Sequence, residues 1–291
     1  MKNLLFLSNL LIVLLTISCN TTPRKNTNTS QNESLAPKEK LKEAYQLFKE
    51  GKDEESVALA EEVLRIGKEK QNDTLIGRAL TSLCRNAQRE LDTTRLAVLS
   101  DQLKELAVSS GNEKWLMYRA HQNAEMWRLV GNMDRAETFY DESMRISKAT
   151  NSKGMYMIDH FNKSFVSTAK GNFEEANNLI KKYYALRLES KEKNDKKQES
   201  NKAIEPTDPY GLIAIAYFLE QQKKYEAAHE VATVTRRLFA EQNIFPEPPD
   251  EKPLLAVEAK VKKELAAITL KNISEQSESQ TVASLLKKHI R

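Results

Sequence analysis

Two short segments of the chain, residues 131–136 and 171–176, carry the same pattern forty residues apart. They read Gly-Asn-Met-Asp-Arg-Ala and Gly-Asn-Phe-Glu-Glu-Ala, and a bulky residue, Tyr140 or Ile180, follows each final alanine by four positions. Each segment separates two stretches with apolar residues at helical spacing, so it is typical of a tight turn between two helices. A turn that recurs at a period of this length indicates a repeat protein whose units stack on one another.

The distribution of proline favours helices throughout this region. All eight prolines lie outside residues 38–205, a stretch rich in Ala, Leu, Glu and Lys. Because proline removes a helix hydrogen bond and clashes with the preceding turn, a long stretch without it is what antiparallel helices need. We therefore predict an all-α fold.

The same period can be followed in both directions from the two turns. Steps of forty residues towards the N-terminus reach Leu91 and then Gly51, so the unit around Leu91 lacks the glycine of its neighbours. Towards the C-terminus, a fifth unit follows a longer spacing, which the charged and proline-containing residues 189–209 account for. The sequence thus predicts about five helix-turn-helix units over residues 39–241. No single unit can bury its apolar stripe alone, so the units are expected to form a solenoid.

These features resemble the tetratricopeptide repeat (TPR). That family has small residues where its two helices cross, here Ala120, Ala124 and Ala136 in the third unit. It also has an aromatic residue near the turn, here Phe173 in the fourth unit. The resemblance implies a right-handed solenoid whose inner groove, lined by the first helix of each unit, holds a peptide or a helix of a partner protein. Other helical repeats are the alternative.

The resemblance also indicates which side chains face the groove. Aligning the units places eight residues there: Tyr45, Tyr118, His121, Glu125, Arg128, Phe161, Phe165 and Tyr217. Aromatic anchors mixed with a few polar groups suit the recognition of a peptide or a helix. The alternative is that several of these aromatic side chains only fill space between units.

The C-terminal segment, residues 242–291, departs from the repeat pattern. It begins with a proline-rich stretch at 245–249, which is expected to be a rigid loop. Pro253 suits the first turn of a helix that would run to about Leu270 and cap the last apolar face. Residues 274–280 are expected to lack regular structure, and the tail at 281–291 is expected to form a small basic helix docked on the surface.

The N-terminus resembles the signal peptide of bacterial lipoproteins. Residues 1–18 combine a positive start with about a dozen mostly apolar residues, a run too short for a membrane span of about 20 residues. Cys19 follows a small serine, as in the lipobox, although Thr16 stands where that family prefers leucine. The resemblance implies cleavage before Cys19, acylation of that residue with fatty acids such as palmitate, and a flexible tether at 19–38. Asn20 in place of aspartate favours outer-membrane sorting; an ordinary secretory signal or an uncleaved anchor are the alternatives.

Charge and motif content exclude several other classes of function. The net charge is +4, from 45 basic and 41 acidic residues interspersed along the chain, which argues against a nucleic-acid-binding face. Four scattered histidines give no metal-ligand spacing, and His121 with Glu125 lacks further ligands. No glycine-rich phosphate loop and no nucleophile motif is present, so we expect no catalytic activity, cofactor, metal or small-molecule substrate.

The predicted function is a scaffold in the bacterial cell envelope, anchored by lipid and placed at the outer membrane, that holds a protein partner in its groove. Two alternatives share this architecture. One is a periplasmic sensing or regulatory module that acts with a separate signalling protein. The other is an accessory factor in outer-membrane protein assembly.

Overall fold

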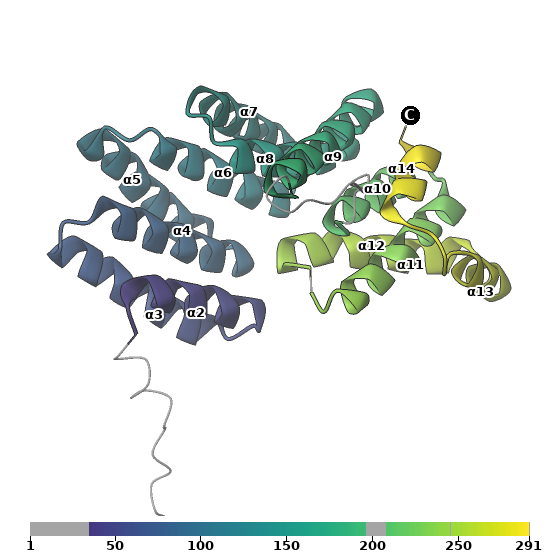
Figure 1. The fold of residues 1–291 in the computed structure, drawn as a ribbon, viewed down its shortest axis with the longest axis horizontal. Helices are drawn as coiled ribbons and strands as arrows, with labels where there is room; N and C mark the ends of the chain where they lie inside the picture. The colour runs from purple at the N-terminus through teal and green to yellow at the C-terminus, as the bar shows by residue number, and fades with distance from the viewer. Residues whose placement is uncertain (1–34, 196–207, 245, 291) are drawn as a thin grey trace, which may run out of the picture. The chain divides into compact units, whose positions relative to one another are not determined.

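The computed structural model describes residues 35–195, 208–244 and 246–290 of the chain. The predicted signal peptide, Cys19 and nearly all of the tether lie outside the described residues, as does most of the predicted insertion. Over the described part the chain forms thirteen helices and no strand, which confirms the all-α class. These helices all belong to one unit, Ala36–Arg291, and only that unit is described (Figure 1).

The helices follow one another at regular intervals. Their bounds are α2 (Pro37–Lys49), α3 (Asp53–Glu69), α4 (Asp73–Arg89), α5 (Thr93–Ser110), α6 (Lys114–Leu129), α7 (Met133–Ala149), α8 (Lys153–Ala169), α9 (Phe173–Asp195), α10 (Tyr210–Gln221), α11 (Tyr225–Glu241), α12 (Pro248–Glu264), α13 (Ala267–Gln276) and α14 (Val282–His289). Consecutive helices from α2 to α9 pack against each other, as do α10 with α11 and α11 with α12. The first helices of successive pairs also touch, α2 with α4, α4 with α6, α6 with α8 and α8 with α10. This packing of neighbours is consistent with a helical solenoid.

The turns between helices share one backbone conformation. In the short turn between two consecutive helices, one residue has a positive φ. These residues recur at intervals of twenty: Gly51, Gln71, Leu91, Gly111, Gly131, Asn151 and Gly171, and again Lys223 and Asn243. After the predicted turn at Gly131, the Asn132 side chain accepts a hydrogen bond from the Arg135 backbone N–H at 3.2 Å and caps α7. A left-handed residue thus follows nearly every helix of the repeat, and at α4, α5 and α7 the side chain of the next residue caps the following helix.

The second unit keeps this geometry although its sequence departs from the pattern. Leu91 adopts φ 54°, the conformation that glycine takes in the corresponding turns at Gly51, Gly131 and Gly171. The next residue, Asp92, caps α5 by accepting a hydrogen bond from the Arg95 N–H at 2.8 Å. The fold of this unit is set by its neighbours and its cap rather than by a glycine.

Small residues set how closely the helices approach. Ala120, Ala124 and Ala136 are completely buried where α6 crosses α7, as expected for the crossing of a helix pair. Between units, a Cβ at Gly77 would lie 2.4 Å from the Trp115 ring, so α4 and α6 could not pack as they do with any larger residue there.

The C-terminal segment corrects three expectations. α12 begins at Pro248, within the stretch expected to be a loop, because Pro248 and Pro249 occupy the first helical positions, where an N–H has no partner in any case. Pro253 therefore lies inside α12 rather than in its first turn, and the helix ends at Glu264. The stretch expected to lack structure is helical up to Gln276, the end of α13.

The packing of this segment agrees with a capping role. α12 packs on α10 and α11 and buries Leu254, Val257 and Val261. The basic tail forms α14, where Leu285 is fully buried and the Lys288 ammonium donates to the Glu230 carboxylate of α11 at 2.8 Å. Across the described helices, no segment has the length and hydrophobicity to cross a membrane.

Candidate functional site

Three adjoining hollows lie along the first helices of the units, and together they are called the groove here. The central hollow has a volume of about 360 Å³ and is lined from α2, α4, α6, α8, α9 and α10 and by the start of α12. The N-terminal hollow, about 650 Å³, lies between α2, α4 and α6, and the C-terminal hollow, about 190 Å³, lies between α6, α8, α10 and α12. Tyr45 and Arg85 line both the N-terminal and central hollows, and Pro249 lines both the central and C-terminal ones.

The structure brings all eight predicted groove residues to these hollows. Tyr45, His121, Glu125 and Phe161 line the central one, Tyr118 the N-terminal one, and Arg128, Phe165 and Tyr217 the C-terminal one. Their exposure divides them into two kinds. The three tyrosines are partly exposed, whereas the other five are at most 9% exposed and belong largely to the wall. Phe165 of α8 packs against Tyr217 of α10, with ring centroids 5.8 Å apart, and so fills space between two units, as the space-filling alternative expects.

The polar residues of the wall are engaged with each other. The Arg128 guanidinium donates to the Glu125 carboxylate at 2.7 Å, and the Tyr140 hydroxyl donates to the other oxygen of that carboxylate. Burial alone would raise the pKa of Glu125, but the positive charges of Arg128 and His121 outweigh it and lower that pKa. Glu125 is therefore held as a carboxylate and is not a candidate proton donor.

His121 is held in a second buried contact. Its Nδ1 lies 2.7 Å from the carboxylate of Asp159, which is completely buried and also accepts a hydrogen bond from the Ser143 hydroxyl at 2.6 Å. Burial would lower the pKa of His121, but the hydrogen bond and charge of Asp159 raise it above its ordinary value. Serine and histidine both bond the carboxylate rather than each other, so this trio lacks the serine–histidine contact that nucleophilic catalysis requires.

The start of α12 closes part of the groove. The Tyr45 hydroxyl of α2 donates to the Glu247 carboxylate, a contact between residues 202 positions apart. Asp250 lies 3.9 Å from the Arg128 guanidinium and is 14% exposed. Burial raises the pKa of Asp250 to about 8, with Arg128 opposing the rise and nearby carboxylates adding to it. Residues 246–250, called the Pro-rich segment below, thus bring the carboxylates of Glu247 and Asp250 to the groove, where the chain passes from the extended Glu247 into the first turn of α12.

Sequence reasoning missed both Asp159 and the Pro-rich segment. Asp159 is an acidic residue within an otherwise largely apolar part of α8, which is the signal that could have indicated a buried polar contact. The Pro-rich segment was recognised as rigid, but nothing local in the sequence indicates that it reaches α2. Another missed residue is Gln122, whose side-chain carbonyl lines the central hollow without a hydrogen-bond partner among the described residues.

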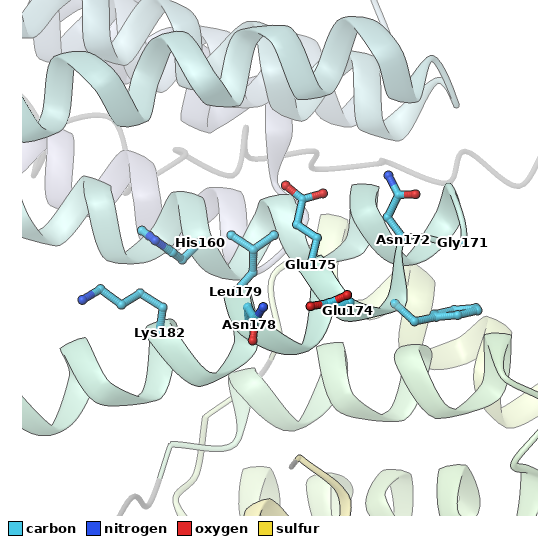
Figure 2. A pocket seen from close by; sticks show the side chains of 9 residues that line it. His160, Gly171, Asn172, Glu174, Glu175, Asn178, Leu179 and Lys182 are labelled. Carbon is cyan, nitrogen blue, oxygen red and sulfur yellow. The ribbon is translucent and has the colours of Figure 1, made fainter.

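A separate, more open hollow of about 790 Å³ lies at the α8–α9 turn (Figure 2). None of the predicted groove residues lines it. Two of its polar groups are occupied by neighbours, since His160 bonds the Tyr156 carbonyl at 2.6 Å and Glu175 pairs with Lys163 at 3.1 Å. In the part of the chain that the structure describes, no cluster of three His, Cys, Asp or Glu side chains could hold a metal ion.

Comparison with known proteins gives no family for this chain. No protein-family model matches its sequence, and no curated protein matches it significantly.

Proposed function

We propose that this protein is a scaffold that holds a peptide or a helix of a partner protein in its groove. One observation carries the proposal: the eight groove residues, chosen from α2, α6, α8 and α10 by repeat alignment, line hollows that adjoin one another. Three half-exposed tyrosines, Tyr45, Tyr118 and Tyr217, are spread over the groove. Tyrosine combines a large apolar face with a hydroxyl at little entropic cost, so it is a suitable anchor for a bound chain.

The proposal includes a repeat type and a location. The forty-residue period, the small residues at the helix crossing and the shared turn support the TPR type. The lipobox-like sequence before Cys19 supports acylation there and a place at the outer membrane. A lipid anchor contributes roughly 0.8 kcal/mol per buried methylene, so several acyl chains would confine the scaffold and raise the effective concentration of a membrane-bound partner.

We further propose that the scaffold has no catalytic role. In the wall of the groove the carboxylates of Glu125 and Asp159 are each neutralised by a neighbour. Paired groups of this kind stabilise a wall but offer no free acid, base or nucleophile to a substrate.

Site-specific photo-crosslinking in the native host tests the proposal. A photoreactive phenylalanine analogue replaces Tyr118 in one variant and Tyr217 in another, because both tyrosines are partly exposed in the groove. The matched control places the same analogue at Val108 of α5, which is 76% exposed and lines none of the hollows described above. We expect one protein adduct common to the two groove positions and absent from the control.

A Cys19→Ala variant separates the anchor from the groove. Loss of the adduct together with loss of membrane fractionation would support confinement by lipid, whereas an unchanged adduct would limit the proposal to the groove. Equal adducts at Val108 and at the groove, or adducts at Val108 alone, would overturn the proposed use of the groove. A barrel protein as the adduct would favour a role in assembly, and a signalling protein would favour sensing.

A further inference from the structure

The N-terminal hollow differs from the rest of the groove in its charge. Five cationic side chains line it, Lys38, Lys42, Arg78, Arg85 and Lys114, against a single carboxylate, Glu39. Positive side chains from α2, α4 and the start of α6 thus surround one cavity of about 650 Å³. Such a cavity attracts a negatively charged ligand.

Most of these cations have no carboxylate partner among the described residues. Lys42 pairs with Glu39 at 2.9 Å, but Arg78, Arg85 and Lys114 form no ion pair with any residue that the structure describes. Arg85 instead lies over the Tyr45 ring, with its guanidinium carbon 5.1 Å from the ring centroid. In the rest of the groove Arg128 is paired with Glu125 and Arg187 with Asp208. Cations without a carboxylate partner among the described residues therefore gather at the N-terminal hollow, and Arg85 extends this positive charge to the edge of the central hollow.

Two acidic side chains of the Pro-rich segment, Glu247 and Asp250, already line the neighbouring central hollow. Tyr45, which also lines the N-terminal hollow, donates to Glu247 of the Pro-rich segment, and Asp250 approaches Arg128. This segment enters α12 with Glu247 in an extended conformation, φ −66° and ψ 152°. The groove thus already accommodates two carboxylates of the protein's own chain, and one of them is bonded to Tyr45, which also lines the N-terminal hollow.

Aromatic side chains give the same hollow an apolar floor. Trp115 and Tyr118 of α6 lie with ring centroids 5.7 Å apart, and Tyr45 and Leu41 of α2 line the cavity with them. An apolar floor with cations around it matches a peptide that alternates acidic and apolar side chains. A phosphate headgroup would satisfy the cations but would leave these rings without a partner.

From this arrangement we infer that the N-terminal hollow binds an acidic segment of the partner protein, with its carboxylates on Arg85 and Arg78 and an apolar side chain against Tyr118. The inference rests on the proposed function and specifies the chemistry of the partner. Arginine suits this role because its planar fork can meet a carboxylate with two parallel hydrogen bonds.

Fluorescence anisotropy with a labelled synthetic peptide tests the inference on the full chain. The probe alternates glutamate and leucine, and its control carries glutamine in place of glutamate. Arg85→Gln and Arg78→Gln remove the two guanidinium groups, while Arg145→Gln removes an exposed arginine of α7 that lines none of the hollows described above. We expect the acidic peptide alone to bind, Arg85→Gln to weaken binding at least about tenfold, and Arg145→Gln to leave it unchanged.

Each other outcome overturns the inference. No binding of the acidic peptide, or equal weakening by Arg85→Gln and Arg145→Gln, would mean that the hollow has no such site. Binding to vesicles of phosphatidylglycerol but not to the peptide would assign the cations to a membrane surface. Circular dichroism of each variant checks that the helices are retained. Groove adducts in the crosslinking experiment together with a negative peptide titration would refute only the acidic segment and leave the proposed scaffold standing.

Discussion

Replacement of Gly131 by alanine tests the turn on which the repeat depends. Gly131 has φ 84°, and no atom lies within 4 Å of a Cβ added there, so the substitution meets no steric obstacle. Its cost is the left-handed backbone conformation, about 1–2 kcal/mol for a residue with a Cβ. Alanine also restricts the conformations of the unfolded chain, which stabilises the folded state by about 0.4–1 kcal/mol and offsets part of this cost. The expected net result is a free energy of unfolding lower by about 1 kcal/mol.

Gly154→Ala is the matched control, because it makes the same chemical change with the opposite expected sign. Gly154 also has open space at its Cβ position, but it lies inside α8 without a positive φ. Gly154 is the second residue of α8, and alanine there is expected to stabilise the protein by about 0.4–1 kcal/mol, because it lowers the conformational freedom of the unfolded chain. Urea denaturation followed by helical ellipticity measures both, with the slopes compared to check that the transition is unchanged. If Gly131→Ala were as stable as Gly154→Ala, the left-handed turn would not exist at this position.

Two further substitutions probe packing and protonation. Gly211→Ala places a Cβ 2.4 Å from the Tyr184 ring and is expected to lower the free energy of unfolding by about 1–3 kcal/mol. Adding Tyr184→Leu removes the ring and is expected to restore part of the lost stability. If the double variant were no more stable than Gly211→Ala, the clash would be contradicted. Asp250→Asn tests the carboxyl whose pKa burial raises to about 8 in the folded protein, from an ordinary value of about 4. Between these values the folded state binds the extra proton, so Asp250 makes wild-type stability fall as pH rises from about 4 to 8. The melting temperature of the Asn variant, relative to that of wild type, should therefore rise between about pH 5 and pH 8. A difference in melting temperature that does not change with pH would refute the raised pKa.

Much of the fold follows from local features of the sequence. Glycine at three of the turns, a proline-free interior and apolar residues at helical spacing predict the helices, because each depends on residues close in the chain. The left-handed conformation of Leu91 and Lys223 could not be predicted from such local features, because neither residue is a glycine. These residues accept a left-handed φ only because packed helices on both sides fix the chain, and packing of that kind is not a local property.

The position of the groove could be predicted because it follows from the repeat pattern of the sequence. The contact of the Pro-rich segment with α2, which closes part of the groove, could not be predicted. Repeat alignment finds the face of each first helix, so it could bring residues such as Tyr45 and Tyr217 to one surface. It has no means to place the Pro-rich segment, which lies outside the repeat and contacts a helix 202 positions away. Nor does it show that Asp159 is buried beside His121, because that depends on how α6 and α8 pack.

The difference between wall and surface decides which groove substitutions are informative. Removing Glu125 would leave the Arg128 guanidinium buried without its partner, at a cost of about 3–5 kcal/mol. Loss of binding in such a variant would then reflect unfolding as much as recognition. Arg85 is only partly buried and forms no ion pair with the described residues, so its replacement removes a charge without stranding another. Binding measured at Arg85 and at the half-exposed Tyr118 therefore reports on the groove, whereas stability measured at Glu125 reports on the solenoid that holds it open.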